Sequence, residues 1–424
     1  MLIANHWTQS IREIVGAEAA LPPGTSPWKQ ITPALVVYPR TASEVGKVLR
    51  FAADEGLGVI PRGRGTKVGW GEAPTRADIV LSLESLDGLV AHEPGDMTVT
   101  TEAGMGISDL QTEVTATGAR LDLDPPFLGA ATLGGLIASQ STGPVHVRIS
   151  DLILGMEIAL ADGSLVRTGS RVVKSVAGFD LHKALVGSRG TLGVITEMTW
   201  RLRPSPSASR YLTAEVAPVE VADRLAALRQ SEVRPAWTLI ENGRWEGFPP
   251  RRIGKESVLV HLVCEGEAEA VDTHLEKAAE ILGAGGNGAS GSAGGESDIL
   301  RMAIRNFPHH HLDWIPCRIG VLPASVLDLF GEATEFSLMA HMESGLVHAG
   351  VPRAGIAAGS PGEGVDRLRR VAEGMGGYLT VEAPAEDGID IWGRRRDDFF
   401  LMEAMKKEFD PKATLFPGHL FGNT

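Results

Sequence analysis

Cysteine and long apolar runs are scarce in this chain, and each scarcity excludes a class of protein. The 424 residues include only two cysteines, Cys264 and Cys317. Two thiols make no disulfide framework and cannot supply the four thiolates that an iron–sulfur cluster usually needs. The longest uninterrupted apolar run, from Ala34 to Tyr38, has five residues, against the roughly 18 that cross a bilayer. The sequence therefore predicts no transmembrane segment and no iron–sulfur cluster of its own.

Positive charge is also in short supply. The chain has 40 Lys and Arg against 53 Asp and Glu, a net charge of −13, which repels a phosphate backbone and predicts no nucleic-acid binding. Residues 1–16 mix polar and apolar side chains and lack the apolar stretch of a secretory signal. With 43% apolar and 22% charged residues, the composition is that of a globular protein, which we expect to be soluble and cytoplasmic.

Glycine is abundant instead, with 51 residues in the chain, where the usual share of about 7% would give about 30. The first three clusters lie next to strand-like sequence. The fourth consists of Gly, Ser and Ala, which predicts a mobile surface loop, in preference to a substrate lid. The four clusters are residues 56–71, 129–143, 187–193 and 283–295.

Hydrophobic periodicity predicts an α+β fold in at least two domains. Thr41 and Glu44 form a capping-box pattern before a helix that Gly56 ends, and Asp162-Gly163 joins two strand-like runs as a hairpin turn. The first half is therefore expected to contain antiparallel elements. A polar, proline-containing stretch at residues 204–209 is the best domain boundary. We expect an N-terminal segment at 1–30, a first domain at 31–205, an α+β second domain at 206–390 and a C-terminal segment at 391–424.

The first glycine cluster has the composition of an anion-binding loop, because closely spaced glycines let backbone N–H groups approach a pyrophosphate. Its spacing, Gly63, Gly65 and Gly69, is not the Rossmann pattern. A Walker loop is excluded as well, since neither Gly-Lys pair of the chain is followed by Ser or Thr. From the residues alone, an anion-binding loop and a plain glycine-rich turn remain equally open.

Two further segments follow in order, Ala131-Thr-Leu-Gly-Gly135 and Gly187-Ser-Arg-Gly-Thr-Leu-Gly-Val-Ile-Thr-Glu197. The three segments together resemble the FAD-binding domain of the vanillyl-alcohol oxidase family, also called the PCMH-type FAD domain, over about residues 30–205. The resemblance implies two α+β subdomains that hold FAD, followed by a substrate or cap domain of antiparallel sheet and helices. It also implies that the C-terminal segment returns to the FAD domain.

Within that family, three segments are similar to the FAD-binding subunits of glycolate oxidase complexes. They are residues 65–71, the segment Val173-Lys-Ser-Val-Ala-Gly-Phe-Asp180, and the tail Phe409-Asp-Pro … Leu415-Phe-Pro-Gly418. In the tail, Phe416 stands where the pattern of such subunits has Asn. The chain is also longer than such a subunit usually is, and we expect the excess in the second domain.

The resemblance assigns the cofactor contacts residue by residue. The first loop would hold the pyrophosphate, largely through backbone N–H groups, the second segment would line the flavin, and the third would meet the adenine end. The implied FAD-binding residues are Arg62, Gly63, Arg64, Gly65, Thr66, Lys67, Pro125, Thr132, Leu133, Gly134, Gly135, Ser139, Gly193, Val194 and Ile195.

The resemblance further implies an FAD-binding subunit of a glycolate or 2-hydroxy-acid oxidase complex that passes electrons to a partner. The implied partners are a larger FAD-binding oxidase subunit and an iron–sulfur subunit, through which the chain could associate peripherally with a membrane. Two alternatives stay open: a self-sufficient FAD oxidoreductase of a hydroxy acid or sugar alcohol, and a structural subunit with a vestigial FAD site. Oxidation of a hydroxy acid needs a base, and the sequence names none.

Other candidate groups carry less weight. Three consecutive side chains at 309–311 cannot converge on one ion, so the sequence predicts no metal site there. His341 and His348 are seven residues apart, which could place both on one face of a helix, but Gly345 would interrupt that helix. Arginines could bind a substrate carboxylate through a bidentate fork, although single arginines are more often surface residues. The residues in question are His309, His310, His311, His341, His348, Arg301, Arg305, Arg318 and Arg353.

The first loop also predicts how FAD is attached. Relatives with covalent FAD use a His near this loop, whereas this sequence has Thr66-Lys67-Val68 there. We expect noncovalent FAD, so trichloroacetic acid should release all the yellow colour of the purified protein into the supernatant. Colour retained in the precipitate would contradict this prediction.

Overall fold

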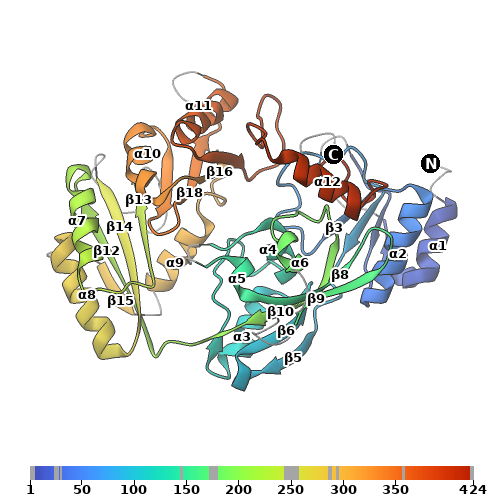
Figure 1. Ribbon diagram of the computed structural model, residues 1–424, viewed down its shortest axis with the longest axis horizontal. Helices are drawn as coiled ribbons and strands as arrows, with labels where there is room; N and C mark the ends of the chain where they lie inside the picture. Colours follow the sequence, from blue (N-terminus) through green and yellow to red (C-terminus); the bar gives the residue numbers. More distant parts are fainter. Residues whose placement is uncertain are drawn as a thin grey trace. The chain divides into compact units, whose positions relative to one another are not determined.

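The computed structural model describes residues 5–22, 28, 31–143, 147–170, 180–242, 257–284, 289–292, 296–355 and 359–420. The chain divides into two compact units, and both combine helices with sheets, which confirms the α+β class (Figure 1). Within the described ranges, no helix is long and apolar enough to cross a membrane. Unit 1 comprises Met1–Thr142, Val147–Ser205 and Arg394–Thr424, and unit 2 comprises Gly143–His146 and Pro206–Gly393.

Unit 1 begins with a small mixed sheet. Its spatial order is β1 (Ala20–Leu21), β2 (Leu35–Val37), β4 (Ile79–Ser82) and β3 (Val59–Arg62). β2 and β3 both run parallel to β4, so the first half is not made of antiparallel strands alone. Its helices are α1 (Asn5–Val15), the one-turn η1 (Ala17–Ala19) and α2 (Ala42–Glu55).

Helix α2 shows how local sequence sets the ends of an element. Thr41 caps the helix by accepting a hydrogen bond from the Glu44 backbone N–H, and Gly56 ends it in the left-handed conformation, with φ of 66°. The Glu44 carboxylate accepts from the backbone N–H of Arg40, one residue before the position that a capping box uses. The predicted helix therefore forms, with a cap shifted by one residue.

A second sheet of unit 1 is antiparallel. Its order is β5 (Leu89–Glu93), β6 (Thr98–Glu102), β10 (Val194–Arg201), β8 (Ile153–Ala159) and β9 (Leu165–Gly169). The predicted hairpin through Asp162 and Gly163 joins β8 to β9. A short pair of strands, β7 (Ala119–Arg120) and β11 (Arg203–Pro204), lies apart from this sheet. The helices are η2 (Pro94–Asp96), α3 (Ile107–Thr115), α4 (Leu133–Ser139), α5 (Ile149–Leu152) and α6 (Leu181–Ala184).

Unit 2 is built on one antiparallel sheet of eight strands. Its order is β15 (Ala289–Ser292), β12 (Ala208–Val216), β14 (Val258–Gly266), β13 (Trp237–Glu241), β17 (Ser337–His341), β18 (Leu346–Pro352), β16 (Trp314–Gly320) and β19 (Tyr378–Val381). Apolar side chains of one face form a core with four helices, α7 (Pro218–Gln230), α8 (Ala268–Leu282), α10 (Val326–Glu332) and α11 (Pro361–Gly374). A smaller cluster on the other face includes Ile304 of α9 (Glu296–Asn306). A one-turn helix, η3 (Pro323–Ser325), precedes α10.

The prediction of a mobile loop over residues 283–295 is wrong for Ala289–Ser292. These residues form β15 and pair antiparallel with β12, from Arg210 opposite Ser292 to Thr213 opposite Ala289. The open edge of β12 offers backbone N–H and C=O groups, and pairing with them outweighs the low strand propensity of Gly, Ser and Ala. Residues 285–288 and 293–295 lie outside the described residues.

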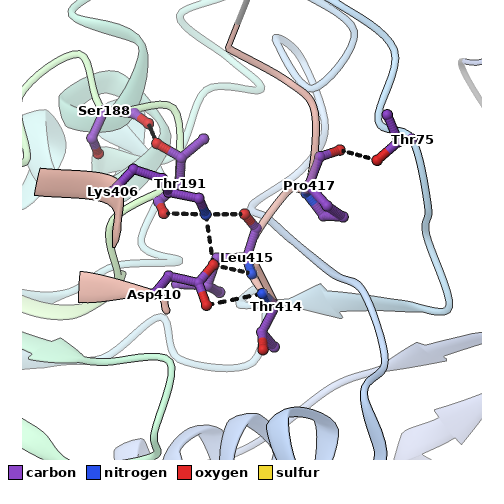
Figure 2. A network of polar contacts seen from close by, with 8 residues as sticks. All are labelled: Thr75, Ser188, Thr191, Lys406, Asp410, Thr414, Leu415 and Pro417. Atoms are coloured by element: carbon purple, nitrogen blue, oxygen red, sulfur yellow. Dashed lines mark hydrogen bonds and ion pairs between the residues drawn. The ribbon is translucent and has the colours of Figure 1, made fainter. Parts of the chain in front are cut away.

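A buried ion pair fixes the last part of unit 1. Lys406, on α12 (Phe399–Phe409), donates hydrogen bonds to Asp410 at 2.6 Å, to the Leu415 carbonyl at 2.7 Å and to the Thr191 carbonyl at 2.9 Å (Figure 2). Asp410 also accepts from the backbone N–H groups of Thr414 and Leu415. Lys406 is 7% exposed and Asp410 is 2% exposed. One ammonium and one carboxylate therefore hold together three segments of the chain.

This arrangement lays the tail beside the first sheet. Val59 of β3 donates to the Thr414 carbonyl at 2.7 Å and accepts from the Phe416 N–H at 2.9 Å. Val59 and Leu415 form a parallel bridge, so the tail adds a further extended segment next to β3. The Pro417 carbonyl then accepts from the backbone and the hydroxyl of Thr75 (Figure 2). The tail thus follows the strand that leads into the first glycine cluster.

Replacing Lys406 by Met should destabilise unit 1 severely. The substitution leaves the Asp410 carboxylate buried without its cation, and breaking a buried pair in this way costs about 3–5 kcal/mol. Urea unfolding of the cofactor-free protein measures the change. Lys407→Met is the matched control: Lys407 is exposed, and its loss should cost no more than about 0.5 kcal/mol. Equal stability of the two variants would contradict the role assigned to the ion pair.

Candidate functional site

One pocket of unit 1 gathers the three glycine-rich segments. Thirteen of the fifteen residues predicted to bind FAD line it. It is lined by Pro61, Arg62, Gly63, Arg64, Gly65, Thr66, Lys67, Val68, Trp70, Leu83, Thr132, Gly134, Gly135, Ala138, Ser139, Arg189, Gly190, Gly193, Val194, Ile195, Phe416 and His419.

Two predicted contacts, Pro125 and Leu133, are not among the lining residues. Leu133 is fully buried in the core of unit 1, and Pro125 is buried as well. The second segment leads into the helix α4. A helix turns successive side chains about its axis, and Leu133 faces the core while its neighbours Thr132 and Gly134 line the pocket.

The first loop and α4 pack so closely against their neighbours at the pocket that Gly63 and Gly134 have no room for a side chain. A Cβ atom built on Gly63 would lie 2.1 Å from the Thr132 hydroxyl oxygen, and one on Gly134 would lie 2.8 Å from the Ala103 Cβ. Thr132 is held in place because its side chain caps α4, accepting from the Gly135 N–H at 3.4 Å. The backbone of the first loop therefore packs against the Thr132 side chain at the start of α4, and both segments line the pocket.

Four cations line this pocket, Arg62, Arg64, Lys67 and Arg189, and none of its described lining residues is Asp or Glu. Arg64 is 3.4 Å from the carboxylate of Asp109, outside the lining. The buried Nε of Arg62 has no hydrogen-bond partner among the described residues. Burying such a donor without a partner is costly. The pocket is therefore suited to an anion.

Sequence reasoning missed two aromatic rings that the tail brings into the pocket. Phe416 stacks on His419, with ring centroids 3.8 Å apart and planes at 20°, and both line the pocket. The Nδ1 atom of His419 lies 2.6 Å from the Glu72 carbonyl oxygen. Burial, with the positive charge of Arg189 nearby, lowers the pKa of His419 to about 3. The tail motif was the available signal, but Phe416 in place of Asn hid its relation to the pocket.

In unit 2, a buried charge cluster surrounds Glu382. His309 lies 3.2 Å and Arg318 3.9 Å from its carboxylate, and His348 is opposite Arg318 in the pairing of β18 with β16. Burial alone would raise the pKa of Glu382, but His309, followed by Arg318 and His348, lowers it to about 2. Burial lowers the pKa of His348 to about 4, against the opposing effect of Glu382. Glu382 was not identified from the sequence.

The other singled-out residues of unit 2 are mostly engaged in structural contacts. His310 and His311 contact each other with tilted rings whose centroids are 4.2 Å apart, and His341 contacts His348 edge-on at 5.9 Å. No group of three His, Cys, Asp or Glu that could hold a metal occurs in the described part of the chain. Arg301 donates to Ser209 at 2.7 Å, Arg353 forms an ion pair with Glu386, and Arg305 lies on α9.

The remaining part of the glycolate-oxidase resemblance, Val173–Phe179, lies outside the described residues. Asp180, its last residue, precedes the one-turn helix α6. Its exposed carboxylate forms an ion pair with Lys183 at 2.6 Å and is not among the residues that line the pocket.

Known proteins match both the first domain and the fold. Residues 33–169 match a family model described as "FAD binding domain". The chain is 29% identical over 265 residues to the glycolate oxidase subunit GlcD of Bacillus subtilis, covering 59% of this chain and 56% of that protein. It is 30% identical over 210 residues to the mitochondrial D-lactate dehydrogenase [cytochrome] of Arabidopsis thaliana, covering 47% of this chain and 37% of that protein. The alignments thus span about half or less of these relatives.

A solved structure of p-cresol methylhydroxylase with substrate bound superposes with a TM-score of 0.73 at 17% identity, covering 98% of this chain and 96% of that chain. At this identity the likeness establishes the fold, and the predicted PCMH-type architecture is confirmed. Residues 33–169 thus match an FAD binding domain, and the chain shares its fold with p-cresol methylhydroxylase.

Proposed function

We propose that the chain is an FAD-dependent oxidoreductase of 2-hydroxy acids, acting as the FAD-binding subunit of a glycolate or related oxidase complex. The observation that carries the proposal is the cationic, glycine-walled pocket of unit 1. It occurs in a chain similar to a glycolate oxidase subunit and a D-lactate dehydrogenase. Glycolate and D-lactate share a hydroxyl group on the carbon next to a carboxylate, and this defines the proposed substrate class.

The residues of the pocket fit FAD at its pyrophosphate. The unpartnered Nε of Arg62 supplies a buried N–H donor, and Gly63 and Gly65 leave the backbone of the loop open to the approach of phosphate oxygens. A Cβ at Gly63 would collide with Thr132, so the cradle depends on the absence of a side chain. We propose that Arg62 through Lys67 hold the pyrophosphate and that Gly193 through Ile195 lie toward the adenine.

Bound FAD would supply the hydride acceptor for oxidation of a carbon bearing a hydroxyl group. The protein's task is then to bind the cofactor, exclude water and position the acid. In unit 2, the buried cluster of His309, Arg318, His348 and Glu382 provides imidazole, guanidinium and carboxylate groups in one place. We propose that this cluster belongs to the substrate domain, and we assign no base.

The proposed partners follow from the lack of cysteine ligands for an iron–sulfur cluster in this chain. With two cysteines in the whole sequence, both buried, an iron–sulfur cluster needs another chain. A larger FAD-binding oxidase subunit and an iron–sulfur subunit are therefore proposed as partners, and any membrane association would occur through them. The expected cytoplasmic location stays a prediction.

The two alternatives differ in what the isolated chain does. A self-sufficient oxidoreductase would turn over a hydroxy acid or sugar alcohol with an artificial dye as acceptor. A structural subunit with a vestigial site would purify without colour. The four cations around a pocket in which Gly63 and Gly134 cannot carry a side chain without collision favour a working FAD site over a vestigial one.

Replacing Gly63 by Ala should abolish the yellow colour of the purified protein, because the new methyl group would collide with Thr132 and push the loop away from α4. The flavin absorbance per protein, measured after gel filtration, should fall at least about tenfold, as expected when a close backbone approach to phosphate is lost. Gly95→Ala is the matched control, since Gly95 is exposed and a Cβ there meets nothing within 4 Å. Full flavin content in both variants would contradict the proposed cradle.

Anaerobic addition of a 2-hydroxy acid tests the reaction. We expect flavin absorption bands in the purified chain, and we expect glycolate or D-lactate, but not L-lactate, to bleach them once the partner subunits are present. Bleaching of the isolated chain would instead support the self-sufficient enzyme. Absence of the bands would contradict FAD binding, and bands unaffected by any of these acids in the assembled complex would contradict the proposed substrate class.

A further inference from the structure

The pocket of unit 1 contains a histidine whose two ring nitrogens have different surroundings. His419 is 1% exposed and lines the pocket. Its Nδ1 atom lies 2.6 Å from the carbonyl oxygen of Glu72, and a carbonyl oxygen can only accept a hydrogen bond. The proton of the ring must therefore be on Nδ1.

The charge of the ring is fixed as well. Burial, with Arg189 nearby, lowers the pKa of His419 to about 3, so the imidazole is neutral at any pH at which the protein would work. A neutral imidazole with its proton on Nδ1 has a lone pair on Nε2. The bond to Glu72 thus makes Nε2 a permanent hydrogen-bond acceptor.

No described residue occupies this acceptor. The bond to Glu72 uses Nδ1, and the stacked ring of Phe416 covers the face of the imidazole, with centroids 3.8 Å apart, but offers no donor. The other nitrogen-bearing side chains of the described pocket wall, those of Arg62, Arg64, Lys67, Trp70 and Arg189, are donors only. Nε2 is therefore the one nitrogen acceptor in a wall otherwise rich in donors.

The ring cannot turn to satisfy Nε2 elsewhere. Phe416 is stacked on it, and the backbone that leads to it is held at two points: Pro417 by Thr75, and Leu415 by Lys406 (Figure 2). An acceptor held in a fixed position on the pocket wall suits a ligand that donates to it. FAD has an N–H group on each of its ring systems, N3–H on the flavin and the amino group on the adenine.

We propose that Nε2 of His419 accepts a hydrogen bond from a ring N–H group of bound FAD, which makes His419 a positioning residue for the cofactor. The inference rests on FAD binding by unit 1 and is independent of the acid that the protein oxidises. It adds to the cationic loop, which recognises the charge of the pyrophosphate, a contact that recognises a ring.

Two amide substitutions separate the two nitrogens. In His419→Asn, the amide N–H can replace Nδ1 and keep the bond to Glu72, but nothing replaces Nε2. In His419→Gln, the longer side chain can place its amide oxygen near the position of Nε2, whereas the bond to Glu72 is lost. His419→Phe keeps a stacked ring and removes both nitrogens.

The measurement is the Kd of each cofactor-free variant for FAD, by quenching of flavin fluorescence. Loss of one buried hydrogen bond should raise the Kd about tenfold in the Asn and Phe variants, while the Gln variant should stay within about threefold of the wild type. Thermal unfolding of the cofactor-free proteins should rank them differently, with Asn above Gln, because only Asn keeps the bond to Glu72. An order of the variants by Kd for FAD that differs from their order by thermal stability indicates that His419 contacts the ligand.

FMN and ADP identify the donor. If the Asn substitution weakens FMN along with FAD, the donor is the flavin N3–H; if it weakens ADP along with FAD, the donor is the adenine amino group. Equal Kd values for FAD in all four proteins, or Kd values that simply follow thermal stability, would overturn the proposal while leaving FAD binding intact. Failure of the wild-type apoprotein to bind FAD at all would overturn the assignment of the pocket itself.

Discussion

The ion pair of Lys406 and Asp410 is the interaction on which the proposed cofactor pocket depends. Its ammonium reaches the carbonyl of Thr191, in the third glycine segment, and the carbonyl of Leu415 in the tail (Figure 2). Charge that is buried so deeply is stabilising only when every hydrogen-bonding position is used. Here the carboxylate accepts from Lys406 and from two backbone N–H groups. The pair therefore acts less as a source of stability than as a constraint on where the tail can lie.

That constraint decides the composition of the pocket. Three walls come from the glycine segments, namely the loop after β3, the start of α4 and residues 189–195, and the cations come from the loop and from Arg189. A further wall, Phe416 and His419, comes from the tail. Without it the pocket would recognise negative charge alone, a property that many small anions satisfy. The tail adds an aromatic surface and a fixed acceptor, groups that a ring system can distinguish.

Local signals explain which parts of the fold could be predicted. The residues that set the ends of α2, Thr41, Glu44 and Gly56, lie next to those ends in the sequence. Asp162-Gly163 is itself the turn of the hairpin between β8 and β9. The glycine segments are also a local signal, because a close backbone approach requires glycine, but their assignment to FAD came from the resemblance. Pro125 and Leu133 were assigned to the pocket by resemblance, which gives the segment but not the direction of each side chain. Helix α4 turns Leu133 into the core.

Long-range pairing explains what could not be predicted. Strand β15 forms because β12 offers an open edge, and the low-complexity sequence of Ala289–Ser292 contains no sign of it. His419 and Glu72 are 347 residues apart, and the sequence of the tail does not predict that His419 contacts Glu72. The cluster around Glu382 arises from strand pairing in the sheet of unit 2, which single residues do not reveal.

The bridge between Val59 and Leu415 also determines which unit can finish folding first while the chain is being synthesised. Unit 2 is encoded between the two parts of unit 1 that meet at this bridge, so the ribosome makes all of unit 2 before it makes the tail. Domains fold as their residues emerge, and unit 2 can complete its own sheet while unit 1 still lacks a wall of its pocket. If the pocket binds FAD as proposed, full affinity is consequently acquired late, only after residues 414–419 have left the ribosome and Leu415 has paired with Val59 of β3.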